Sequence, residues 1–127
     1  NEKVEGSSPF ARSNKTMSDL ANQKCVPCEG NIPPFDQDEI HKYLKKVDGW
    51  DVNSNQDKSF FLTKEFLFKN FKESQNFVNS VGQIAEEENH HPDISFGWGY
   101  CKIKIFTHAI KGLAESDFIL AAKIDRI

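Results

Sequence analysis

The sequence predicts an α+β fold in which three helices cover one face of a four-stranded antiparallel sheet. Apolar residues recur at helical spacing in three segments and alternate in four others, and the segments follow one another in the order α-β-β-α-β-β-α. The 127 residues, of which 38% are hydrophobic, are enough for one core but not for two. No internal repeat is detectable, so we expect a single domain.

The domain is expected to start after a polar N-terminal region. Residues 1–24 are rich in Ser and Asn and show no sustained period, which predicts a disordered arm. Residues 25–127 then form the domain, and its lead-in is extended because four residues near its start oppose regular structure: Pro27, Gly30, Pro33 and Pro34.

The three helices are predicted by apolar spacing and by their end signals. The first covers residues 36–47, with acidic residues early and lysines late, as the helix dipole favours. Asn70 can cap the second helix, whose apolar stripe continues to Glu88 before Pro92 ends it. Residues 115–127 form the closing helix.

The four strands are predicted by alternation of apolar and polar residues. We expect them at Trp50–Asn53, Lys58–Phe68, Asp93–Trp98 and Tyr100–Thr107. One face of the last strand then carries Cys101, Ile103, Ile105 and Thr107, and the other carries Lys102, Lys104, Phe106 and His108.

Composition restricts the expected partners and location. The net charge is −3 and no long Lys/Arg run occurs, which argues against nucleic acid as a direct partner. No apolar stretch approaches the roughly 20 residues that a bilayer-spanning helix needs, and no secretory-signal core is visible, so we expect a cytoplasmic protein without a membrane partner. The three cysteines are an odd number, which favours reduced thiols.

Histidines carry the expected chemistry. His41 lies in the first helix and is given no role, whereas His90 and His91 stand at a helix end and His108 at a strand end. Imidazole exchanges protons near neutral pH, so such rings suit acid–base catalysis. Glu86 lies four residues before His90 and can accept a hydrogen bond from an imidazole. Taken alone, an adjacent pair is more often a surface feature or a helix-terminal cation.

The wider pattern resembles the pterin-4a-carbinolamine dehydratase family. E-E-E-N-H-H-P-D is followed at fixed distances by T-H and by G-L-x-x-x-D. The resemblance covers about residues 25–127, and it matches the family pattern at Glu86, His90-His91-Pro92, Trp98, His108 and Asp117. One position departs from it: animal members commonly carry Trp where this chain has Ile94.

The resemblance implies a cofactor-free and metal-free dehydratase that converts a 4a-hydroxytetrahydropterin to the quinonoid dihydropterin, in recycling of tetrahydrobiopterin. His90 and His108 are then proton donor and acceptor, in an order left open, and His91 orients the substrate or shares the acid role. Glu86 sets an imidazole tautomer or holds the ring edge, Asp117 orients His108, and Trp98 stacks on the pterin.

Family members also suggest a homodimer or homotetramer and, by analogy with animal relatives, a transcription-factor partner and a nuclear location. A protein-interaction module is therefore an alternative function. A metal-dependent hydrolase is another, since the three histidines with Glu86 or Asp117 have the donors for a catalytic zinc, although adjacent histidines suit one tetrahedral ion poorly.

Cys25 and Cys28 form a C-x-x-C motif, which raises a thioredoxin-like or zinc-knuckle alternative. The residues that follow do not open a helix, and a second cysteine pair is missing, so a structural role in the lead-in is favoured.

Overall fold

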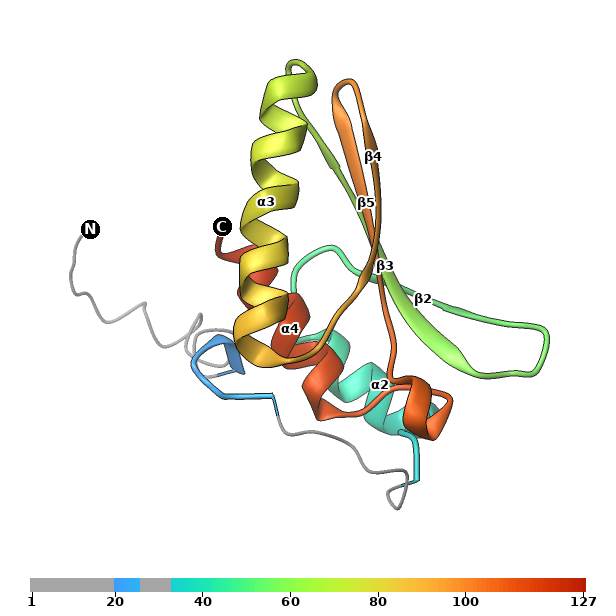
Figure 1. Cartoon of the computed structure of the whole chain (residues 1–127). Coiled ribbons are helices and arrows are strands. Elements are labelled where there is room, and N and C mark those ends of the chain that lie inside the picture. The colour runs from blue at the N-terminus through green and yellow to red at the C-terminus, as the bar shows by residue number, and fades with distance from the viewer. Residues whose placement is uncertain (1–19, 26–32) are drawn as a thin grey trace.

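The computed structural model describes residues 20–25 and 33–127 and confirms the predicted fold class. The elements are α2 (Gln37–Leu44), β2 (Asp51–Ser54), β3 (Phe60–Leu67), α3 (Phe71–Glu88), β4 (Asp93–Gly97), β5 (Tyr100–Ile105), the 3-10 turn η1 (His108–Ile110) and α4 (Glu115–Asp125). The strands form one antiparallel sheet in the order β2-β3-β5-β4, and the helices lie on one side of it (Figure 1).

Side-chain capping sets where the first two of these helices begin. Asp36 accepts a hydrogen bond from the Glu39 amide at 2.9 Å, and Asn70 accepts one from the Glu73 amide at 2.8 Å. Helix α3 begins and ends at the predicted residues, whereas α2 ends at Leu44, three residues before its predicted end.

Strand register places the predicted apolar face against the helices. Leu62 pairs with Ile105, and Ile94 pairs with Ile103, so these side chains share the inner face. Cys101, Ile103 and Ile105 are each at most 1% exposed. Phe118, Leu120 and Ala121 of α4 are fully buried and complete the core with them.

The end of β5 differs from the prediction. The strand stops at Ile105, and residues 107–112 form a closed turn in which Thr107 and Gly112 are bridged. Gly112 has a close neighbour, because a Cβ atom built there would lie 2.7 Å from Cβ of Pro34. Pro34 of the lead-in therefore packs against this turn, and a larger residue at position 112 would displace it.

Residues 20–25 pack on the domain. Leu20 and Ala21 are 2% and 5% exposed and belong to the core. The predicted arm, residues 1–24, is thus described only over residues 20–24, and there apolar burial holds the chain in place. Cys28 lies outside the described residues. Within the described ranges, no helix is long and apolar enough to span a bilayer.

Candidate active site

A buried carboxylate organises the candidate site. Asp117 stands in the first turn of α4 and is 0% exposed. Its Oδ2 accepts hydrogen bonds from the Ala114 amide and the Thr107 hydroxyl, both at 2.8 Å, while Oδ1 lies 2.8 Å from Nε2 of His90. Two oxygens that serve three partners fix both the carboxylate plane and the imidazole facing it.

Asp117 therefore contacts His90 and not His108, which we expected it to orient. Because a carboxylate can only accept, Nε2 of His90 donates, and in the neutral ring Nδ1 is the acceptor. The His90 side chain is 16% exposed. The pair thus consists of a wholly buried carboxylate and an imidazole that still reaches solvent.

Asn89, which precedes the two histidines, sets the direction in which the chain leaves α3. It ends α3 in the left-handed conformation, with φ 52° and ψ 42°, and its amide donates to the carbonyls of Ala85 and Glu86. Asparagine tolerates this conformation better than most residues. The chain reverses direction at this point, so that His90 turns inward to Asp117.

His91 takes the other direction and pairs with Glu86. Nε2 of His91 lies 2.5 Å from Oε2 of Glu86, with the two side chains 54% and 78% exposed. An exposed pair of this kind contributes little to stability, but it does orient the ring. Glu86 therefore contacts an imidazole as expected, and that imidazole belongs to His91.

His108 begins η1 and is exposed. Its ring lies against Phe106 with centroids 4.1 Å apart. Thr107, the residue before it, donates to Asp117, so the ends of α3, β5 and α4 meet around one carboxylate. Thr107 was not expected to take part in the site, although its predicted place on the same face as Ile103 and Ile105 was the available signal.

Trp98 lies away from these residues. It occupies the turn between β4 and β5 and is 71% exposed, whereas His90 precedes β4 and His108 follows β5, at the other end of this antiparallel hairpin. Within this chain the structure brings together His90, Asp117 and Thr107 and does not bring Trp98 to them.

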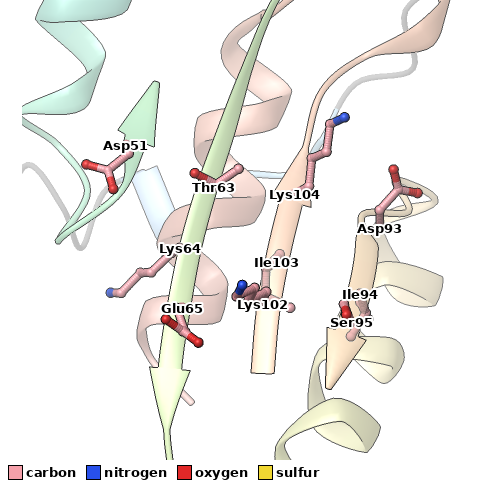
Figure 2. A pocket seen from close by; sticks show the side chains of 10 residues that line it. All are labelled: Asp51, Thr63, Lys64, Glu65, Asp93, Ile94, Ser95, Lys102, Ile103 and Lys104. Atoms are coloured by element: carbon pink, nitrogen blue, oxygen red, sulfur yellow. The ribbon is translucent and has the colours of Figure 1, made fainter. Parts of the chain in front are cut away.

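A cavity of about 480 Å³ lies elsewhere, on the sheet, and none of the predicted site residues lines it (Figure 2). Its polar lining comes from Asp51, Thr63, Lys64, Glu65, Asp93, Ser95, Lys102 and Lys104. Across the described residues, no group of three or more His, Cys, Asp or Glu side chains is arranged as a metal site.

These observations define a small α+β domain in which a buried Asp fixes a partly exposed His at a helix end. The family model "Pterin 4 alpha carbinolamine dehydratase" matches residues 33–127. A Rubrobacter xylanophilus protein provisionally named pterin-4-alpha-carbinolamine dehydratase is 50% identical over 111 residues, covering 87% of this chain and 100% of the relative. An Alkaliphilus metalliredigens protein of the same name is 47% identical, covering 87% and 96%. The chain belongs to the pterin 4 alpha carbinolamine dehydratase family.

Two solved structures share the fold. A transcriptional coactivator/pterin dehydratase from Brucella melitensis aligns with a TM-score of 0.65 at 25% identity, covering 73% of this chain and 96% of that one. A pterin dehydratase-like protein described as a RuBisCO assembly factor in the alpha-carboxysome aligns with a TM-score of 0.53 at 24% identity, covering 61% and 87%. The second likeness concerns the fold alone.

Proposed function

We propose that this protein dehydrates a 4a-hydroxytetrahydropterin to the quinonoid dihydropterin and water, and that it serves recycling of tetrahydrobiopterin. The observation that carries the proposal is the hydrogen bond between Asp117 and His90, found in a chain of this family at the position where the family pattern puts its acid–base groups. Dehydratase activity on a pterin carbinolamine is supported by the names of the relatives.

The reaction needs two proton transfers. N5 of the substrate loses its proton, the C4a–O bond breaks as the hydroxyl takes a proton, and the C4a=N5 double bond forms while water leaves. Hydroxide is a poor leaving group, so an acid at the oxygen and a base at N5 both lower the barrier. Each well-placed group of this kind contributes typically ~10²–10⁴-fold.

His90 is the better candidate for the base. Its Nε2 proton is committed to Asp117, which leaves Nδ1 to accept the N5 proton, and a carboxylate on the far nitrogen stabilises the imidazolium that forms. His108 is then the acid that protonates the leaving hydroxyl. His91, held by Glu86, orients the substrate, and Trp98 is assigned pterin stacking only by the family pattern.

The test is an assay with freshly generated 4a-hydroxytetrahydropterin, in which quinonoid product is followed above its spontaneous rate. We expect His90→Ala and His108→Ala each to lower turnover by roughly 10²–10⁴-fold, because each removes one proton-transfer group. His41→Ala is the matched control, since that histidine is exposed on α2, and it should leave turnover within about twofold.

Two results would contradict the proposal. Wild-type protein that does not accelerate product formation would refute the activity, and turnover unchanged in both variants would refute the assignment of the histidines. Elemental analysis of the purified protein addresses the hydrolase alternative, because stoichiometric zinc lost on substitution of these histidines contradicts a metal-free dehydratase.

We also propose self-association into a homodimer or homotetramer. Leu67, Phe71 and Trp98 are 77%, 46% and 71% exposed, and they lie where β3 ends, α3 begins and β4 turns into β5. Large exposed apolar side chains at one end of a small domain favour burial against another chain. Light scattering after size-exclusion chromatography should give a mass of two or four chains, and a monomer at micromolar concentration would contradict this.

A further inference from the structure

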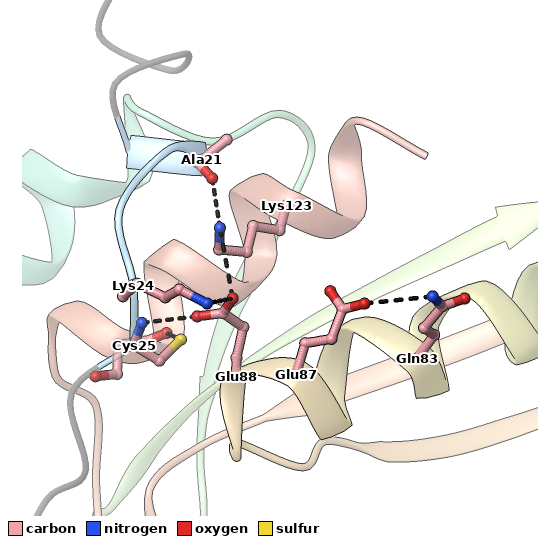
Figure 3. A network of polar contacts seen from close by, with 8 residues as sticks. Ala21, Lys24, Cys25, Gln83, Glu87, Glu88 and Lys123 are labelled. Carbon is pink, nitrogen blue, oxygen red and sulfur yellow. Dashed lines mark hydrogen bonds and ion pairs between the residues drawn. The ribbon is translucent and has the colours of Figure 1, made fainter.

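A second buried carboxylate lies close to the candidate site. Glu88 is the last residue of α3, and its side chain is 5% exposed. Its Oε1 accepts a hydrogen bond from the Cys25 amide at 2.9 Å, and its Oε2 lies 3.7 Å from Nζ of Lys24 and 3.8 Å from Nζ of Lys123 (Figure 3). Glutamate is rarely buried unless it is paired, and here the pairing is with residues 24 and 25 and with α4.

The segment of residues 20–25 is held at several points along its length. Lys123 donates to the Ala21 carbonyl at 2.6 Å, and Arg126 donates to the Asn22 side chain at 3.0 Å. Leu20 is 2% exposed. Lys123 faces Glu88 as well as Ala21, so one lysine of α4 connects the segment to the end of α3.

The same segment contacts both helix ends that form the Asp117–His90 pair. The Cys25 thiol donates to the Ser116 carbonyl at 3.4 Å, and Ser116 immediately precedes Asp117. Glu88 is separated from His90 only by Asn89. A displacement of the segment would therefore be transmitted to both members of the pair through one or two residues.

We propose that Glu88 is a positioning residue of the site: by fastening residues 20–25 across the ends of α3 and α4, it fixes His90 against Asp117. Residues 20–25 lie before residue 33, where the match to the family model begins. The proposal rests on the proposed function only for its effect on turnover. Misplacement of a reacting group by ~1 Å can lower the reaction rate about 10²-fold, so a small shift of His90 is enough to reduce turnover.

The charge on Glu88 supports this role. Burial acts to raise its pKa, but the Cys25 amide and the charges of Lys123 and Lys24 act more strongly in the other direction, and the pKa of Glu88 lies below its usual value. The carboxylate is therefore ionised at neutral pH and holds its two lysines and the amide together.

Four variants of the full chain test the proposal. Glu88→Ala removes the acceptor, Glu88→Gln keeps an acceptor for the Cys25 amide but loses the charge, and Lys123→Met releases the Ala21 carbonyl from the α4 side. Glu87→Gln is the matched control, because Glu87 is the preceding residue of α3, is exposed, and accepts only from Gln83 at 3.3 Å among the described contacts (Figure 3).

Three measurements are made on each variant. Nitrogen-15 NMR detects the His90 Nε2 proton held by Asp117, trypsin cleavage after Lys24 reports release of the segment, and steady-state kinetics separates kcat from KM. For Glu88→Ala we expect loss of the Nε2 proton signal, faster cleavage, and kcat lowered roughly 10–100-fold with KM changed less than about threefold. Glu88→Gln should show a smaller loss, and Glu87→Gln none.

The proposal is overturned if Glu88→Ala is cleaved faster by trypsin but keeps the Nε2 proton signal and the kcat of Glu87→Gln. It is also overturned if cleavage of Glu88→Ala is unchanged. If circular dichroism shows that Glu88→Ala is unfolded, Glu88→Gln and Lys123→Met decide by the same criteria. If the wild type shows no dehydratase turnover, the proposed function fails, while the NMR signal and the cleavage rate still decide whether Glu88 fixes His90.

Discussion

Asp117→Asn is the most informative single change at the candidate site, because it alters one atom of a carboxylate that has three partners. The asparagine oxygen can replace Oδ2 and keep the bonds from the Ala114 amide and the Thr107 hydroxyl. The NH2 group then faces Nε2 of His90, 2.8 Å away in the wild type, and can only donate to it. His90 must therefore present Nε2 as an acceptor, which moves its proton to Nδ1.

The structure gives two separate magnitudes for this change. One charge-assisted hydrogen bond in a fully buried site is replaced by a neutral one, and bonds to charged groups contribute roughly 1.5–3 kcal/mol, so the free energy of unfolding should fall by up to about that amount. Turnover should fall by roughly 10²–10⁴-fold, because the nitrogen proposed to accept the N5 proton is then already protonated.

Asp125→Asn separates stability from catalysis. Asp125 lies on the same helix, its side chain is 7% exposed, and its carboxylate accepts from Trp50 Nε1 at 2.9 Å, Lys64 Nζ at 2.8 Å and the Asp48 amide at 3.0 Å. Urea unfolding should show a comparable loss for both variants, whereas the dehydration assay should show a large loss only for Asp117→Asn. Equal turnover in the two variants would refute the assigned role of the Asp117–His90 pair.

Three further expectations follow from burial. A carboxyl whose pKa is lowered stabilises the fold at pH values above its ordinary pKa of 4.5 and loses that contribution as the pH falls. Between neutral pH and about pH 3, the free energy of unfolding measured in urea should therefore fall less for Glu88→Gln than for the wild type. Burial, aided at Cys25 by the charge of Glu88, raises the pKa of the Cys25 thiol to about 12, and burial raises that of Cys101 to about 11; peptide mapping after iodoacetamide treatment at pH 8 should find both unmodified in native protein and modified in urea. Phe118→Ala should cost about 3–5 kcal/mol of unfolding free energy, because this fully buried ring contacts Tyr43 and Phe35, and a loss below about 1 kcal/mol would contradict that packing.

The fold class could be predicted because apolar periodicity identified each helix and strand. Helix α3 is the clearest case: Asn70 caps it, the apolar stripe runs along it, and Pro92 follows its end, so both ends were predicted at the observed residues. The turn after β5 was harder to predict, since Gly112, which closes it on Thr107, packs against Pro34, and contacts between residues so far apart in the chain leave no local pattern.

The sequence indicated which residues form the candidate site, but it did not indicate which of them contact one another. Spacing placed His90, His108 and Asp117 at ends of elements that meet, but which imidazole faces the carboxylate depends on the rotation of α4 against the end of α3, and no local pattern encodes that angle. Glu88 was not expected to matter, because it contacts residues 20–25, whose polarity suggested a disordered arm, as well as α4.

The left-handed conformation of Asn89 has a consequence for how two identical neighbours differ. Because the chain inverts at that single residue, His90 and His91 face environments of different polarity, 16% and 54% exposed, and each has its own carboxylate. A dipeptide of one amino acid thus supplies two chemically distinct imidazoles. The difference depends on a backbone angle that β-branched residues adopt poorly, so the residue at position 89 sets which carboxylate each imidazole faces.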